Sequence, residues 1–422
     1  MSHDLHQEAM NQVNGTELNR RHVVKSTLPA EVILAVGSLA SAKASVQAAD
    51  ATAPLLPPPI SEQNGIPALG YATDGPKSPL KEFQFQRRGL RAEDVQLEIL
   101  YAGVCHSDLH TARDEWGATS YPCMPGHEIL GRVKAVGSSV KRFKTGDIGG
   151  VGCMVDSCHE CANCLAGLEQ YCLRGATFTY NSPEKGTGSN TFGGYSNTIV
   201  ITESFVIQIP EGMDLKATAP LLCAGITTFS PMRHWKVQSG QRVGVVGIGG
   251  LGHMAVKLAK AHGAHVTMFT STSSKLADAP HLGADEAILE TDEAAYSRLA
   301  SSFDFILTTI PQTFDINPYI KLLKMDGFLV NVGVLATVEP GFDNRQVAGM
   351  RRTIAGSLIG GIAETQEVIN FCAERKIYPD VEMIPIQNLN KAYERMIRSD
   401  VRYRFVIDMK SLNAVGAQSS GT

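Results

Sequence analysis

The sequence lacks both a strong excess of charge of one sign and a long apolar run. Its 38 Lys and Arg residues nearly balance its 42 Asp and Glu residues, which leaves a formal net charge of −4 at pH 7. This balance gives no electrostatic reason to expect nucleic acid or an anionic membrane as a partner. No apolar stretch approaches the roughly 20 residues that a membrane-spanning helix requires. We therefore expect a protein without a membrane span or a nucleic-acid partner.

Glycine and cysteine, in contrast, are plentiful. The chain of 422 residues is long enough for two domains with separate cores, and 40 glycines with 43% hydrophobic residues suit a loop-rich α/β protein. Five of the nine cysteines fall between Cys153 and Cys172, a density that indicates metal binding rather than a disulfide framework.

Residues 1–65 do not have the pattern of a folded domain. The twin arginine within Asn19–Lys25, the weakly apolar stretch Leu28–Ala42 and the small residues ending at Ala48 are typical of a twin-arginine export signal. The proline-rich linker Pro54–Pro59 follows it and favours extended chain. These features predict export to the periplasm. The alternative is a cytoplasmic protein whose disordered N-terminal extension contains the arginine pair by chance.

The stretch from Gly103 to Glu128 contains part of a metal site. Cys105 offers a thiolate and His127 an imidazole, and both ligand types suit zinc. A catalytic zinc keeps three protein ligands and one open position, so a further ligand is required from elsewhere in the chain. Trp116 lies in the loop between these two ligands, where it either lines a substrate pocket or packs into the structure.

Four cysteines on one loop indicate a second metal site. They follow the spacing C-x2-C-x2-C-x7-C and are Cys158, Cys161, Cys164 and Cys172. Four thiolates at this spacing can close a tetrahedral shell, as a structural zinc requires. An iron–sulfur cluster is the main alternative, and a nucleic-acid zinc ribbon is disfavoured because Lys and Arg do not cluster here. Cys123, Cys153 and Cys372 are interpreted as packing residues, with Cys153 in a β-strand.

The segment after Pro210 indicates a nucleotide-binding domain. Arg242–Val246 has the pattern of a buried strand, Gly247–Gly252 matches G-x-G-x-x-G, and His253–His262 has a helical apolar pattern. This order is typical of dinucleotide binding, because the glycines let the backbone approach the pyrophosphate and the helix N-terminus attracts it. The turn residues expected at the cofactor are Gly247, Gly249, Gly250, Leu251 and Gly252.

The second strand of this unit ends in hydroxyl side chains. An NAD site would place Asp or Glu there for the ribose 2′-hydroxyl, and Thr270–Lys275 contains neither. Hydroxyls and a lysine suit a 2′-phosphate, which predicts NADP(H) with Thr270, Ser271 and Lys275 in the phosphate pocket. The alternative is a solvated turn.

Two zinc sites followed by this unit resemble the zinc-dependent medium-chain dehydrogenases over roughly residues 66–408. The family signature G-H-E-x2-G-x5-G-x2-V is present at Gly126–Val140. Leu222–Thr227, Gly252–Met254 and Asp400–Phe405 resemble the cinnamyl-alcohol-dehydrogenase branch, and bacterial broad-specificity aldehyde reductases in particular.

The resemblance implies an α/β protein with a GroES-like β-barrel catalytic domain and a Rossmann domain built on a doubly wound parallel sheet. The expected divisions are a signal and linker at 1–65, the catalytic domain at 66–210, the NADP-binding domain at 211–356, a return to the catalytic domain at 357–408 and a disordered tail at 409–422. We also expect a homodimer.

The same resemblance implies roles for individual residues around the first metal. Cys223 matches the third ligand of the catalytic zinc, and Glu128 matches a residue that can approach the metal. Asp108 matches a carboxylate that orients the His127 ring.

Ser107 and His110 match the hydroxyl and imidazole of the family's proton relay, and Thr227 matches a residue near the nicotinamide. The implied reaction is reversible reduction of an aldehyde to a primary alcohol with hydride from NADPH, with two zinc ions per chain. The alternative is a non-catalytic zinc- and nucleotide-binding protein, such as a redox sensor, which would have no need of a proton relay.

Overall fold

The computed structural model describes residues 65–333 and 337–412. The expected export signal and linker, and most of the expected tail, lie outside these residues. No helix in the two described ranges is long and apolar enough to cross a membrane.

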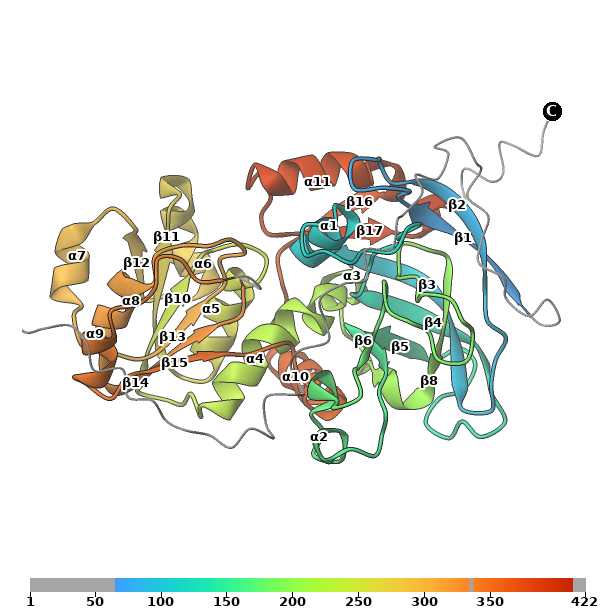
Figure 1. Ribbon diagram of the computed structural model, residues 1–422, viewed down its shortest axis with the longest axis horizontal. Coiled ribbons are helices and arrows are strands. Elements are labelled where there is room, and N and C mark those ends of the chain that lie inside the picture. The colour runs from blue at the N-terminus through green and yellow to red at the C-terminus, as the bar shows by residue number, and fades with distance from the viewer. Residues whose placement is uncertain (1–64, 334–336, 413–422) are drawn as a thin grey trace, which may run out of the picture. The chain divides into compact units, whose positions relative to one another are not determined.

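The first domain is built around a mainly antiparallel sheet (Figure 1). Its strands are ordered β16-β17-β3-β4-β5-β9, and β8 pairs with β3. Every second residue of β3 from Val95 to Ile99 is buried, because successive side chains of a strand point to opposite faces. The elements before the nucleotide domain are β1 (Ile66–Ala72), β2 (Lys81–Arg87), β3 (Asp94–Val104), α1 (His106–Ala112), β4 (Ile129–Val136), β5 (Ile148–Val151), β6 (Met154–Asp156), α2 (Ala162–Leu165), β7 (Thr177–Phe178), β8 (Thr198–Thr202) and β9 (Ile207–Gln208).

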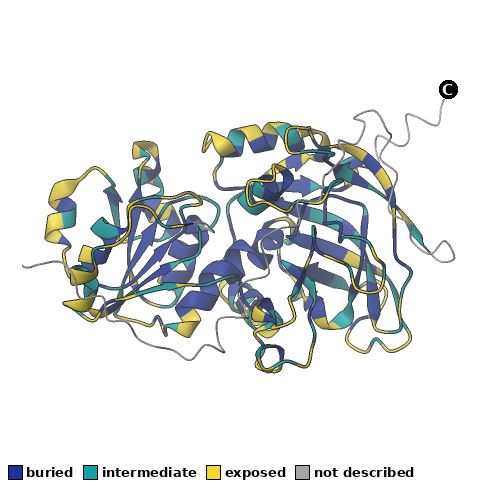
Figure 2. Cartoon of the chain, in the orientation of Figure 1, coloured by how far each residue is buried: buried dark blue, intermediate teal, exposed yellow. Residues whose placement is uncertain are grey.

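The second domain contains a parallel sheet ordered β12-β11-β10-β13-β14-β15. The order reverses direction at β10, which is the switch point where dinucleotides bind in doubly wound folds. Figure 2 shows its strands as mostly buried and the outward helix faces as exposed. Its elements are α3 (Leu215–Thr218), η4 (Ala219–Leu222), α4 (Ala224–His234), β10 (Arg242–Val246), α5 (Gly252–Ala261), β11 (His265–Thr270), η5 (Ser273–Asp278), α6 (Ala279–Leu282), β12 (Glu286–Leu289), α7 (Glu293–Arg298), β13 (Phe303–Thr308), α8 (Asn317–Leu322), β14 (Leu323–Asn331), α9 (Asn344–Ala348) and β15 (Thr353–Gly356).

The chain then returns to the first domain. β17 pairs antiparallel with β3 and parallel with β16, so the C-terminal segment joins the first sheet. Met409 and Leu412 are buried in the core of this domain, at 2% and 0% exposure. The domain therefore extends past residue 408, where the tail was expected to begin, because these two apolar side chains pack under the sheet. The returning elements are α10 (Ile362–Arg375), β16 (Val381–Pro385), α11 (Leu389–Ile397) and β17 (Arg404–Asp408).

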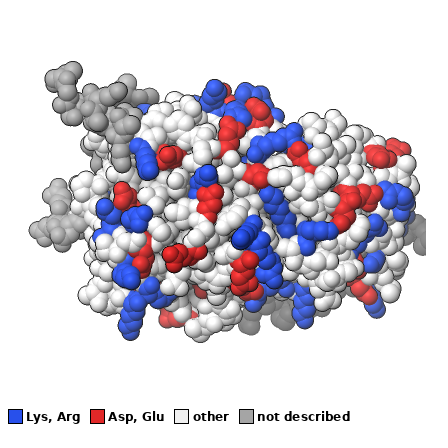
Figure 3. Space-filling model, turned by 180° about the vertical axis from the view of Figure 1, so that it is seen from behind, with Lys and Arg blue, Asp and Glu red and all other residues white. Residues whose placement is uncertain are grey.

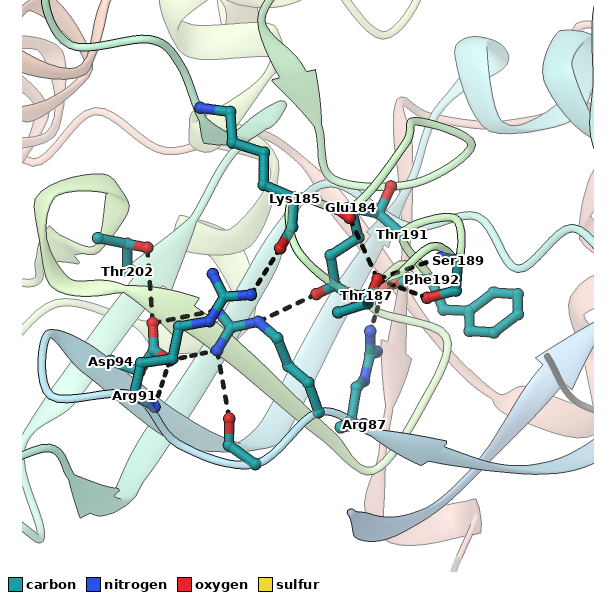
Figure 4. Close-up of polar contacts among 12 residues, drawn as sticks. Arg87, Arg91, Asp94, Glu184, Lys185, Thr187, Ser189, Thr191, Phe192 and Thr202 are labelled. Atoms are coloured by element: carbon teal, nitrogen blue, oxygen red, sulfur yellow. Dashed lines mark hydrogen bonds and ion pairs between the residues drawn. The ribbon is translucent and has the colours of Figure 1, made fainter. Parts of the chain in front are cut away.

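A buried charge network attaches the loop before β8 to the start of β3 (Figure 4). The Arg88 guanidinium pairs with the buried Asp94 carboxylate and also donates to Glu184 at 3.2 Å. Buried charges need such partners, since an unpaired one would be costly to desolvate. On the outer surface, in contrast, Figure 3 shows basic and acidic side chains interspersed over the face in view.

Candidate functional site

Four potential ligand groups that are far apart in the sequence lie together. Cys105, His127, Glu128 and Cys223 are all buried, and one ligand atom from each lies within 4.8 Å of the others. Cys105 caps α1 directly after β3, and His127 and Glu128 precede β4, which pairs with β3. Cys223 stands between η4 and α4. The ends of neighbouring strands and the N-termini of α1 and α4 thus form the cluster.

The donor set fits zinc. Two thiolates and one imidazole are ligands that zinc prefers, and the carboxylate of Glu128 adds an oxygen. Glu128 Oε1 pairs with Arg404, whereas Oε2 is buried without a hydrogen-bond partner among the described residues. A Cβ on Gly103 would lie 1.9 Å from that same Oε2. Glycine is required at position 103 because the carboxylate occupies the space of a side chain.

Asp108 fixes the orientation of the His127 ring. The His127 Nδ1 lies 2.9 Å from Asp108 Oδ1, so the ring donates from Nδ1 and leaves Nε2 for a metal. Burial opposes a charged imidazole, but the Asp108 carboxylate raises the pKa of His127 well above 6.5. Asp108 is itself fully buried and also accepts hydrogen bonds from the backbone N–H groups of Cys105 and Gly126.

The two cysteine ligands perturb each other's pKa. The hydrogen bond with Cys223 lowers the pKa of the Cys105 thiol well below its usual value of 9, and the same pairing raises the pKa of Cys223. Two buried thiolates side by side are unfavourable without a cation. A divalent metal can stabilise both thiolates.

Cys153 also reaches this cluster, which corrects its interpretation as strand packing. It lies between β5 and β6, is half-buried and lines the same cavity as Cys105 and Cys223. A hydrogen bond with Cys223 lowers the pKa of Cys153. Cys123 and Cys372, in contrast, are buried at 2% and 0% exposure in the cores.

The expected relay residues line the cavity at the start of α1. The Ser107 hydroxyl lies 3.6 Å from the Cys105 sulfur. His110 Nδ1 lies 2.5 Å from a Glu115 carboxylate oxygen, and His110 Nε2 is buried without a partner in the described part of the chain. The Trp116 ring stacks on His110 at 5.1 Å while lining the cavity. Glu115 thus favours the tautomer in which Nε2 is a proton acceptor.

A cavity of about 710 Å³ joins the metal cluster to the glycine turn. Four of the five expected turn residues line it, namely Gly247, Gly249, Gly250 and Leu251. The fifth, Gly252, is not among the lining residues and is the first residue of α5. A Cβ on Gly252 would lie 1.9 Å from the Gly247 carbonyl oxygen, so glycine permits this close approach, whereas Gly249 faces open space. The Thr227 hydroxyl is buried, lines the cavity and has no partner among the described residues. The turn and the cavity fit a dinucleotide.

The expected 2′-phosphate residues stand at the end of β11. Thr270, Ser271 and Lys275 all line the cavity. The Lys275 ammonium group donates to the Ile248 carbonyl at 2.8 Å, so it also braces the glycine turn. Burial lowers the pKa of Lys275.

The four-cysteine loop forms a separate cluster. The sulfur atoms of Cys158, Cys161, Cys164 and Cys172 lie within 4.8 Å of one another. The loop has little regular structure, with only α2 and a short 3-10 turn, and Leu165 and Leu173 are 75% and 72% exposed. Four thiolates without a core of their own fit a structural zinc.

Arg404 is a site residue that sequence reasoning did not assign. Its guanidinium lines the cavity, pairs with Glu128 and reaches Gly250, where a Cβ would lie 2.5 Å from Nη1. Its Nε is buried without a partner among the described residues. Arg404 therefore connects the metal cluster to the glycine turn. Its position within Asp400–Phe405, a segment that carried the family resemblance, was the available signal.

Comparisons with known proteins agree with this geometry. Residues 91–211 match the family described as alcohol dehydrogenase GroES-like domain, and residues 250–374 match zinc-binding dehydrogenase. The chain is 49% identical over 347 residues to NADP-dependent alcohol dehydrogenase C 1 of Mycolicibacterium smegmatis, covering 82% of this chain and 98% of the relative. It is 51% identical to aldehyde reductase YahK of Escherichia coli, covering 80% and 96%.

Solved structures of similar proteins share the fold. A cinnamyl alcohol dehydrogenase from Sorghum bicolor superposes with a TM-score of 0.79 at 38% identity, covering 82% of this chain and 98% of the other. The cinnamyl alcohol dehydrogenase of Helicobacter pylori, complexed with NADP(H), gives a TM-score of 0.77 at 41% identity, with 82% and 99% covered.

Proposed function

The chain belongs to the zinc-binding alcohol dehydrogenases with a GroES-like domain, and we infer from this that it is an enzyme that reversibly reduces aldehydes to primary alcohols with NADPH. One observation carries the inference. The ligand cluster of Cys105, His127 and Cys223 and the glycine turn border one cavity, in which a buried imidazole nitrogen of His110 also has no partner among the described residues.

When bound, the metal supplies a Lewis acid and the dinucleotide supplies the hydride. The residues of the chain orient the metal ligands and supply the proton. Asp108 binds Nδ1 of His127, which leaves Nε2 on the far side of the ring from the Asp108 carboxylate. The Ser107 hydroxyl is placed to donate a proton to the developing alcohol. His110 Nε2, left as an acceptor by the contact between Nδ1 and Glu115, takes up a proton from solvent, and the resulting imidazolium returns a proton to Ser107.

This arrangement favours catalysis over a non-catalytic binding role. A protein that only binds zinc and nucleotide has no use for a hydroxyl and an oriented histidine beside the metal ligands. Stacking of Trp116 on His110 also covers one face of the imidazole. The apolar part of the cavity beside Trp116 is where an aldehyde side chain would bind.

The test is turnover of NADPH with small aldehydes. Cys105→Ser and His127→Ala should abolish turnover while NADPH binding, followed by its fluorescence, stays nearly intact. Cys372→Ser is a matched control because it alters a buried cysteine of α10 outside the site. Full activity in either ligand variant would overturn the site assignment.

We propose a homodimer formed through the edge of the nucleotide sheet. Among the described strands β15 pairs only with β14, and its outer residues Thr353 and Gly356 are exposed. An unpaired strand edge readily pairs with a second copy, and a two-fold axis would continue the sheet. Light scattering should give twice the chain mass, and Ala355→Pro should reduce it to one chain. A native monomer would refute the proposal.

We propose that the protein is exported folded through the twin-arginine pathway. The support is the sequence of residues 1–65 and the fact that the Mycolicibacterium relative, matched over 98% of its length, accounts for only 82% of this chain. Export of a folded protein would allow zinc and NADP(H) to be loaded beforehand, with the metal protecting the thiolates from oxidation. Cell fractionation, N-terminal sequencing and the cofactor retained after gel filtration test this. An uncleaved cytoplasmic protein would contradict it.

A further inference from the structure

The hydroxyl of Tyr195 lies behind the metal ligands and has no role in the proposed reaction. The side chain is fully buried between β7 and β8, and its hydroxyl donates to Asp108 Oδ2 at 2.8 Å. The other oxygen of Asp108 receives His127 Nδ1 at 2.9 Å. Tyr195 and His127 therefore hold the same carboxylate from opposite oxygens.

The carboxylate depends on these donors because it lacks a permanent cationic partner. Among the described residues the ion pair of Asp108 is with His127, and no Lys or Arg lies within ion-pairing distance. Each Asp108 oxygen accepts one backbone N–H, from Cys105 on Oδ2 and from Gly126 on Oδ1. The Tyr195 hydroxyl completes the second oxygen, so its loss would leave Oδ2 with one donor and the carboxylate freer to rotate.

The backbone of Tyr195 is joined to the segment that carries His127. Gly193 and Gly194 donate to the carbonyls of Met124 and Gly126, and Tyr195 N–H donates to Pro125. A Cβ on Gly193 would lie 2.3 Å from the Pro125 carbonyl oxygen. The run Gly193-Gly194-Tyr195 thus requires its glycines so that the two segments can approach and the tyrosine can reach under the metal site.

A buried guanidinium holds both sides of Tyr195 in place. Arg87, at the end of β2, donates to the carbonyls of Phe192 and Gly193 before it and to Ser196 Oγ and the Thr198 carbonyl after it (Figure 4 shows part of this clamp). These hydrogen bonds fix the backbone on both sides of Tyr195 and therefore the direction in which its hydroxyl points. Packing alone would not require this, because phenylalanine would fill nearly the same volume.

We propose that Tyr195 is a positioning residue for the catalytic zinc, which acts through Asp108 to hold the His127 ring in the orientation that binds the metal. This inference rests on the proposed function, because it assumes zinc at Cys105, His127 and Cys223. Mutating a residue that hydrogen-bonds to a metal ligand typically lowers metal affinity or activity by about 10- to 100-fold. Tyr195 contacts Asp108 rather than the ligand itself, so we expect an effect at the low end of that range.

The experiment compares Tyr195→Phe with Tyr319→Phe in the zinc-loaded enzyme. Tyr319 of α8 is a buried tyrosine in the core of the nucleotide domain, and its hydroxyl faces Tyr296 and Glu290 rather than Asp108. With excess chelator, Tyr195→Phe should release one zinc per chain about 10-fold faster than wild type, while the second zinc is released at the wild-type rate. Tyr319→Phe should match wild type for both ions, and Tyr195→Phe should bind NADPH normally.

A background variant separates positioning from general loosening. In Asp108→Asn, which already alters the carboxylate, adding Tyr195→Phe should change the zinc release rate less than twofold, because both substitutions interrupt one route. Equal release from Tyr195→Phe and wild type, equal acceleration in Tyr319→Phe, or fully additive effects in the double variant would each overturn the proposal. Wild-type protein without two zinc ions or without aldehyde turnover would instead refute the proposed function.

Discussion

A buried histidine on the cofactor turn should make the stability of this enzyme fall in mild acid. His253 is the second residue of α5, is fully buried and stacks on Tyr403 at 4.9 Å. Its Nδ1 donates to the Gly249 carbonyl at 3.1 Å, and its Nε2 has no partner among the described residues. Burial, aided by the nearby Lys257, lowers the pKa of His253 from 6.5 to about 3.

Proton binding to His253 determines the sign and size of this pH effect on the free energy of unfolding. The folded chain keeps His253 neutral, whereas the unfolded chain binds a proton as the pH falls below 6.5, so the unfolded state is favoured in acid. The contribution of this residue is fully present above pH 6.5 and is lost as the pH falls from 6.5 towards 3. At pH 5 the loss is roughly 2 kcal/mol, from 1.5 pH units at about 1.4 kcal/mol each.

The assay is equilibrium urea unfolding between pH 8 and pH 5 with His253→Gln. The variant should be less stable than wild type at pH 8, but its stability should fall by roughly 2 kcal/mol less than that of wild type between pH 8 and pH 5. His265→Gln, an exposed histidine at the start of β11, is the control and should follow wild type. Because all three proteins bind zinc through the same residues, loss of metal in acid affects them alike. Parallel curves for wild type and His253→Gln would refute the reasoning.

Three further experiments test the site and the four-cysteine loop. Arg404→Met should destabilise the protein by about 3–5 kcal/mol in urea unfolding because it strands the buried Glu128 carboxylate, and adding Glu128→Gln should recover much of that loss; no recovery would contradict the pairing. Glu115→Gln should lower kcat by about 10-fold with unchanged NADPH affinity, because an amide can donate as well as accept and so no longer fixes the His110 tautomer or stabilises its imidazolium, and an unchanged kcat would argue against a relay role. Cys161→Ser should lose one zinc per chain by elemental analysis and lower Tm, whereas normal zinc content and Tm would rule out a structural zinc there.

The fold was predictable where one local pattern determined it. The strand at Arg242–Val246 was expected with the boundaries that β10 has, because a buried parallel strand is a continuous apolar run before a glycine turn. The glycine turn and the following helix were equally local signals. The GroES-like sheet was named through the family signature, since short antiparallel strands such as β9, of two residues, leave little periodicity to detect.

The metal site shows where local reasoning stops. His127 and its neighbours were readable from spacing alone, but Cys223 needed the family resemblance because the fold brings it from almost 100 residues away. The interpretation of Cys153 as a strand-packing residue was wrong for a related reason. Its nearness to the four-cysteine loop in sequence says nothing about which way the turn between β5 and β6 directs its thiol, and the structure directs it to the catalytic cluster.

Glycines contain information about this site that side-chain motifs do not. Gly103 lacks a Cβ where Glu128 Oε2 lies, and Gly250 lacks one where the Arg404 guanidinium lies. The two glycines therefore make room for the two ends of one buried ion pair, whose partners are 276 residues apart. A larger residue at either glycine would have to displace one member of this ion pair, and neither charge has another ion-pair partner among the described residues. Alanine at position 103 should therefore impair metal binding, even though no atom of that residue belongs to the ligand set.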